Sequence, residues 1–149
     1  MEAAAPVPRL TVITLGVGDM SRSIAFYEAL GFARRFRATG EAVAFFDTGR
    51  PVLALFPWDQ LAQDATIPEN PRPQGFRGMT LAWNCRSREE VDAVLDLAIS
   101  KGASLLRPAH DTDHGGYSGY FADPDGHAWE AVVAPNIDVG EDRRVHLPD

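Results

Sequence analysis

One acidic side chain, Glu130, stands among apolar neighbours near the C-terminal end of the chain, in the stretch GGYSGYFADPDGHAWE at residues 115–130. A carboxylate in such surroundings must find hydrogen-bond partners or take up a proton. It could act as a general base, a metal ligand or an acceptor that orients a bound molecule. A structural carboxylate, satisfied by an Arg, Tyr or Ser across a sheet, explains the same pattern.

A second set of candidate groups is the run H-D-T-D-H at residues 110–114, followed later by His127. Imidazole and carboxylate groups bind divalent metals, but a site needs three or more converging protein ligands. Neighbours in one polar loop rarely converge, so we interpret this run as a solvated loop. We expect His127, just after a turn, to be exposed, and Cys85, after an apolar strand, to be a small buried hydrophobe.

The element that positions Glu130 is a predicted β-hairpin. Asp123-Pro124-Asp125-Gly126 suits a type I turn, because Pro124 presets φ and Gly126 can take a positive φ. Side chains alternate in character on both sides of this turn, as in a pair of strands.

Two similar units precede and include this hairpin. The first has strands at 10–18, 32–38, 42–47 and 52–58, with a helix capped by Asp19 or Ser21 and ended by Gly31. The second has strands at 79–84 and 103–108, the hairpin, and a helix between Ser87, which opens an S-x-x-E capping box, and Gly102. We predict one α+β domain of two βαβββ modules, at about 9–58 and 78–134, whose curved mixed sheets enclose a cleft.

Prolines interrupt residues 59–77, which we interpret as a linker or covering loop without regular structure. We interpret residues 135–149 as a polar tail. Pro68, Pro71 and Pro73 are the basis for the first interpretation. The formal net charge of −7 argues against nucleic acid and anionic membranes as partners. The chain begins without a secretory signal pattern, and a single cysteine suits a cytoplasmic protein.

Two segments of the chain resemble the vicinal oxygen chelate superfamily, which includes glyoxalase I, extradiol dioxygenases, and bleomycin- and fosfomycin-resistance proteins. They read GVGDMSRSIAFYEALGF in the first unit and FADPDGHAWE in the second. The likeness runs from about Leu10 to Pro135 and implies the glyoxalase/bleomycin resistance/dihydroxybiphenyl dioxygenase fold. Since this fold hosts many unrelated functions, the resemblance implies no single reaction.

The resemblance also implies four metal-ligand positions, which metal-using members usually fill with His and Glu. In this chain they are Val12, Ala54, Met79 (or its neighbour Gly78) and Glu130. One carboxylate cannot hold a divalent ion against water. We therefore predict no metal at this position and no cofactor.

Aromatic residues on the predicted strands supply the expected ligand contacts. Side chains alternate between the two faces of a strand, but this alternation alone leaves open which residues face the cleft. The candidates for ligand binding are Phe45, Phe56, Trp83, Tyr117 and Phe121. We predict a homodimer that binds a small, partly apolar molecule without the usual metal site. The alternative is a lyase or dioxygenase with a relocated metal site, or with Glu130 as a general base.

Overall fold

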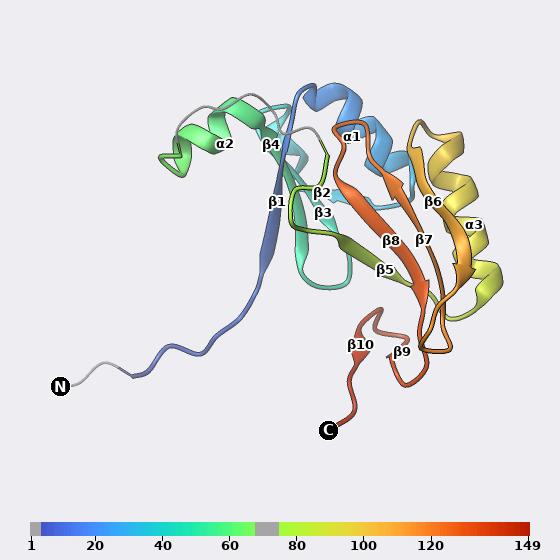
Figure 1. The fold of residues 1–149 in the computed structure, drawn as a ribbon. Helices are drawn as coiled ribbons and strands as arrows, with labels where there is room; N and C mark the ends of the chain where they lie inside the picture. Colours follow the sequence, from blue (N-terminus) through green and yellow to red (C-terminus); the bar gives the residue numbers. More distant parts are fainter. Residues whose placement is uncertain (1–3, 68–74) are drawn as a thin grey trace.

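The computed structural model describes residues 4–67 and 75–149, which form two modules of similar topology (Figure 1). The first module contains β1 (Val12–Val17), α1 (Met20–Ala29), β2 (Ala33–Arg35), β3 (Ala44–Asp47) and β4 (Val52–Pro57). Its sheet has the order β1-β4-β3-β2, in which β1 runs parallel to β4 and the other pairs are antiparallel.

The second module repeats this plan. It contains β5 (Leu81–Asn84), α3 (Arg88–Ser100), β6 (Ser104–Asp111), β7 (Tyr117–Ala122) and β8 (Ala128–Val133). The strand order β5-β8-β7-β6 is that of the first sheet, with β5 parallel to β8. The predicted α+β fold of two βαβββ modules with mixed sheets is confirmed.

The helices begin where their capping residues predict. The Asp19 side chain accepts a hydrogen bond from the backbone N–H of Arg22, which selects Asp19 over Ser21 as the cap of α1. At α3 the Ser87 hydroxyl accepts from the backbone N–H of Glu90. Gly31 and Gly102 follow the two helices with φ of 100° and 109°, values that favour glycine.

Two expectations about regular structure are wrong, and the polar tail contains a strand pair that was not predicted. Residues 58–64 form a helix, α2 (Trp58–Asp64), because the prolines that would break it come later in the chain. The tail contains a short antiparallel pair, β9 (Asp138–Val139) and β10 (Val145–His146). The strand expected at 32–38 stops early and gives way to a 3₁₀ turn, η1 (Arg37–Thr39). Pro68, Pro71 and Pro73 lie outside the described residues.

Each sheet has one face covered by helices and one face that we call its open face. Alternate residues such as Leu15, Leu55 and Phe46 are almost fully buried on the covered face of the first sheet. Ala131 and Phe121 are equally buried on the covered face of the second. The two covered faces belong to one apolar core, which joins the modules. None of the helices in the described part of the chain has the length and apolar composition needed to span a bilayer.

Candidate functional site

Glu130 lies on the open face of the second sheet. It is half-buried and stands opposite Ala82 on β5 and Tyr120 on β7. The Tyr120 hydroxyl donates a hydrogen bond to Glu130 Oε2, and this bond is the main cause of the raised pKa of Tyr120. Tyr120 therefore remains a protonated donor at neutral pH, and Glu130 has the cross-strand partner that a carboxylate among apolar residues requires.

The other positions implied by the resemblance do not converge on a metal. Val12 and Ala54 lie on the open face of the first sheet, the former exposed and the latter buried. Met79 is exposed and precedes β5. Valine and alanine offer no ligand atoms and the methionine thioether is a poor ligand for a hard divalent ion. Within residues 4–67 and 75–149, no three His, Cys, Asp or Glu side chains are grouped to hold a metal ion. The residues present at this position do not fit a divalent metal.

The five aromatic residues predicted to bind a ligand lie in four different places. Phe45 and Phe56 are half-buried on the open face of the first sheet. Tyr117 packs toward α3, where its hydroxyl donates to Asp92. Phe121 is fully buried against Trp129, with parallel rings 6.1 Å apart. Trp83 faces the space between the two modules.

The H-D-T-D-H run does not form a cluster of metal ligands. Asp111 forms an ion pair with Arg88, and His110 Nδ1 lies 3.2 Å from the carbonyl oxygen of Pro108. His110 and Asp111 belong to the end of β6, so the expected loop begins later than predicted.

His127 is buried, with 9% of its surface exposed, so the expectation of exposure is wrong. Its Nε2 lies 2.7 Å from the Gly16 carbonyl oxygen and therefore donates to it, while Nδ1 accepts from Arg77 at 3.1 Å. Its ring stacks on Trp58 at 6.0 Å. The cause of the burial is that the D-P-D-G turn packs against the first module instead of projecting into solvent.

We call the contacts of this turn with α1 the inter-module clamp. Asp125, whose side chain is 2% exposed, accepts hydrogen bonds from Gly18 N at 2.7 Å, Ser23 Oγ at 2.7 Å and Arg22 Nη2 at 3.2 Å. Asp123 accepts from the Tyr27 hydroxyl at 2.6 Å. Burial raises the pKa of Tyr27 and the nearby Asp123 charge raises it further, so this hydroxyl also stays protonated. The anionic turn sits at the positive end of α1.

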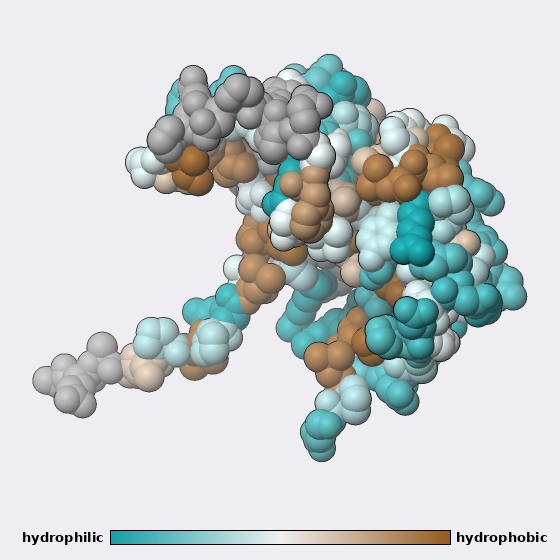
Figure 2. Space-filling model, viewed as in Figure 1, coloured by the Kyte–Doolittle hydropathy of each residue, from teal (hydrophilic) through white to brown (hydrophobic). Residues whose placement is uncertain are grey.

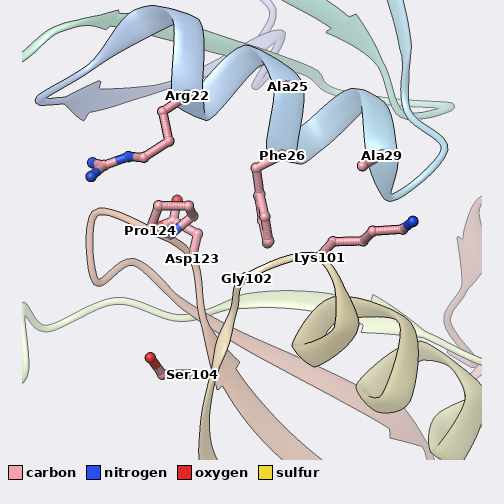
Figure 3. A pocket seen from close by; sticks show the side chains of 9 residues that line it. All are labelled: Arg22, Ala25, Phe26, Ala29, Lys101, Gly102, Ser104, Asp123 and Pro124. Carbon is pink, nitrogen blue, oxygen red and sulfur yellow. The ribbon is translucent and has the colours of Figure 1, made fainter.

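A hollow of about 610 Å³ lies beside the clamp, between α1 and the end of α3 (Figure 3). Phe26 points from α1 toward the chain at Gly102, and Arg22 and Lys101 lie at opposite ends of the hollow. Arg22 is paired with Asp125 and Asp123 is bonded to Tyr27. Most of the charged side chains that line this hollow thus form contacts that hold the two modules together.

A larger cavity, which we call the inter-module cleft, has a volume of about 1120 Å³. Figure 2 shows the surface hollowed between the modules, with the C-terminal segment beside the opening. The covered face of each sheet supplies apolar wall residues where α1 and α3 leave it bare. The central ones are Ile13, Phe32, Leu53, Leu81, Trp83 and Trp129. Phe32 lies 5.2 Å from Trp83 and 5.8 Å from Trp129, so aromatic rings from both modules meet in the wall.

Reasoning from the sequence missed the clamp and most of this wall. The sequence pattern places Asp125 only in a turn, although a second Asp after Pro124 leaves a carboxylate free to bond elsewhere. Ser23, a small polar residue on the otherwise apolar face of a helix, was a signal for a buried hydrogen bond. Leu53 and Leu81 gave no such signal, because core residues and cleft residues share the same strand face.

The chain was compared with known proteins. A family model described as "Glyoxalase/Bleomycin resistance protein/Dioxygenase superfamily" matches residues 9–131. The chain is 26% identical over 144 residues to metallothiol transferase FosB of Lysinibacillus sphaericus (strain C3-41), with 95% of each chain covered.

Solved structures show the same relationship. A glyoxalase-related enzyme from Fulvimarina pelagi superposes with a TM-score of 0.85 and 37% identity, covering 96% of this chain and 100% of that one. Lactoylglutathione lyase from Agrobacterium tumefaciens superposes with a TM-score of 0.65 and 23% identity, covering 86% of this chain and 95% of that one. The second likeness concerns the fold alone.

Proposed function

Because the chain belongs to the glyoxalase/bleomycin resistance protein/dioxygenase superfamily, we propose that it binds a small, partly apolar molecule in the inter-module cleft. It does so in the cytoplasm, without a divalent metal at the position that the family resemblance implies. The observation that carries the proposal is the cleft itself, whose wall combines aromatic and aliphatic side chains from both modules.

The size and chemistry of the cleft support this proposal. A volume of about 1120 Å³ exceeds the roughly 300–1,000 Å³ typical of small-molecule pockets, so a ligand of ordinary size fits. Each apolar Å² that a ligand and the wall remove from water contributes roughly 25 cal/mol. Trp83, half-buried beside Phe32, has part of its surface free to contact the ligand.

Binding of a neutral apolar fluorophore, N-phenyl-1-naphthylamine, tests the proposal. We expect saturable binding with energy transfer from Trp83 and Trp129, which line the cleft. Trp83→Leu should weaken binding about tenfold, because an aromatic pair contributes about 0.5–1.5 kcal/mol beyond its buried area. Phe56→Leu, which also replaces an aromatic side chain by leucine but on an open face, is the control and should bind as the wild type does.

A second cleft variant tests the proposal independently in case Trp83→Leu does not fold. Thr11 is exposed and lines the cleft, so Thr11→Trp should fill part of the volume without disturbing the core. Equal binding by the wild type and both cleft variants would contradict the proposal. Loss of binding in Phe56→Leu alone would move the site to the open face of the first sheet, where Phe45 also lies.

We also propose that the protein forms a homodimer through its open faces. On the first sheet, Val12 is 42% exposed and Val52 is 36% exposed, and neighbouring Phe45 and Phe56 are half-buried. Apolar strand faces of this kind favour association with a second copy of the chain.

A second candidate function, proton transfer by Glu130, is favoured by its hydrogen bond with Tyr120 on an open face. If Glu130 is a general base, Glu130→Gln should lower the turnover of a substrate about 10²–10⁴-fold while binding is retained. If it is a structural acceptor, the same variant should leave turnover near the wild-type value and lower stability only by about 1 kcal/mol.

A further inference from the structure

The charged side chains around the inter-module cleft are mostly of one sign. Among the described residues, five arginines line it, against the two carboxylates of Asp47 and Glu90, although the whole chain carries a net charge of −7. The arginines are Arg9, Arg50, Arg86, Arg143 and Arg144. The cleft is thus a positively charged region on an acidic protein, and its apolar walls concentrate the field there.

The two carboxylates are already engaged. Asp47 accepts from the backbone N–H of Gly49 and from Arg143, both at 2.9 Å, and these contacts lower its pKa. Glu90 accepts from the backbone N–H of Arg86 at 2.8 Å. Of the five arginines, Arg143 is the one that forms an ion pair with either carboxylate.

Two of the arginines hold the C-terminal segment beside the cleft. Arg86 donates to the carbonyl oxygens of Val139 and Gly140, at 3.3 and 2.7 Å, and Arg143 reaches back to Asp47. Arg144 directly follows Arg143 and also lines the cleft. Within the described residues, no carboxylate lies within 4.0 Å of the guanidinium groups of Arg50 or Arg144.

We propose that the inter-module cleft selects an amphipathic organic anion, whose apolar body lies on the Trp83–Phe32 wall and whose anionic head group binds Arg50 and Arg144. The proposal rests on the proposed function and adds the charge class of the ligand. Guanidinium groups bind carboxylate, sulfonate and phosphate oxygens through paired N–H donors. An arginine rim above an aromatic wall fits a molecule with one charged end and one apolar end.

Two fluorophores that differ by one sulfonate test this proposal. N-phenyl-1-naphthylamine is neutral, and 8-anilinonaphthalene-1-sulfonate adds the anionic group to the same skeleton. We expect the wild type to bind the sulfonate at least about fivefold more tightly at low ionic strength, as contacts with two exposed charged side chains allow. Arg50→Gln combined with Arg144→Gln should abolish this preference and leave the affinity for the neutral probe unchanged.

The control removes two positive charges elsewhere. Arg37→Gln combined with Arg88→Gln alters two exposed ion pairs outside the cleft and should keep the preference for the sulfonate. Equal affinities of the wild type for both probes, or an equal loss in the control, would overturn the anion proposal while the binding function stands. If neither probe binds, the proposed function itself fails.

Discussion

The inter-module clamp makes one aspartate far more important to stability than its place in a surface turn suggests. In Asp125→Ala, Gly18 N–H and the buried Ser23 hydroxyl lose their acceptor. A hydrogen bond to a charged group contributes about 1.5–3 kcal/mol. Arg22 is half-exposed, so its ion pair adds only about 0–1 kcal/mol. We therefore expect the free energy of unfolding to fall by about 3–7 kcal/mol, a large share of the roughly 5–15 kcal/mol of an ordinary domain.

Urea unfolding followed by far-UV circular dichroism measures this loss through the transition midpoint. The matched control is Asp111→Ala, which also removes an aspartate paired with an arginine, but one whose side chain is 76% exposed. This control should unfold close to the wild-type midpoint, because exposed ion pairs are screened by water and salt. Equal shifts in the two variants would refute the reasoning that burial of the Asp125 contacts, and not charge pairing, holds the modules together.

Three further predictions concern other parts of the chain. Burial raises the pKa of Cys85 from 9.0 to about 12, so native protein at pH 8 should resist thiol reagents. Between about pH 9 and pH 12 the Cys85 thiol ionises in the unfolded chain but not in the native one, so the urea midpoint should fall as the pH rises through this range, and fall less in Cys85→Ala. Rapid labelling of the native protein at pH 8 would contradict the raised pKa. Gly119→Ala should lower the free energy of unfolding by about 1–3 kcal/mol, because a Cβ there would lie 2.5 Å from Leu95 Cδ1; an unchanged urea midpoint would show that β7 and α3 can shift apart. Light scattering at tens of micromolar should give twice the 16.3 kDa chain mass, falling to the monomer mass in Val12→Lys, whereas a monomeric wild type would count against the dimer.

Much of the fold was predictable from local patterns. Asp19 and Ser87 start their helices through side-chain hydrogen bonds that depend on a few neighbouring residues. The D-P-D-G turn and the alternation around it predicted the β7–β8 hairpin for the same reason. The proline argument failed for α2, since a proline disfavours helix at its own position and just before it, and Trp58–Asp64 precedes Pro68 by several residues.

The site was less predictable, because the alternation of side chains along a strand separates the two faces of a sheet but does not show which part of the protein packs against each face. Phe121 and Phe45 are both aromatic residues on strands, yet one is fully buried and the other lies on an open face. Trp83 lines the cleft only because Phe32 from the other module lies beside it. Such contacts join residues far apart in the chain and depend on how the modules pack.

The contacts between the modules also explain why the resemblance indicates a family and not a reaction. The two matching segments, residues 16–32 and 121–130, touch each other in the structure. Gly18 and Ser23 bond to Asp125, and Tyr27 bonds to Asp123 and accepts from Trp129 Nε1 at 3.0 Å. These contacts fix the angle between the sheets and thereby the shape of the inter-module cleft. Both segments supply the joint of the fold, and Phe32 and Trp129 within them also line the cleft. The proposed selection of a ligand depends in addition on Trp83, Arg50 and Arg144, which lie outside both segments, where a sequence can change without weakening the joint.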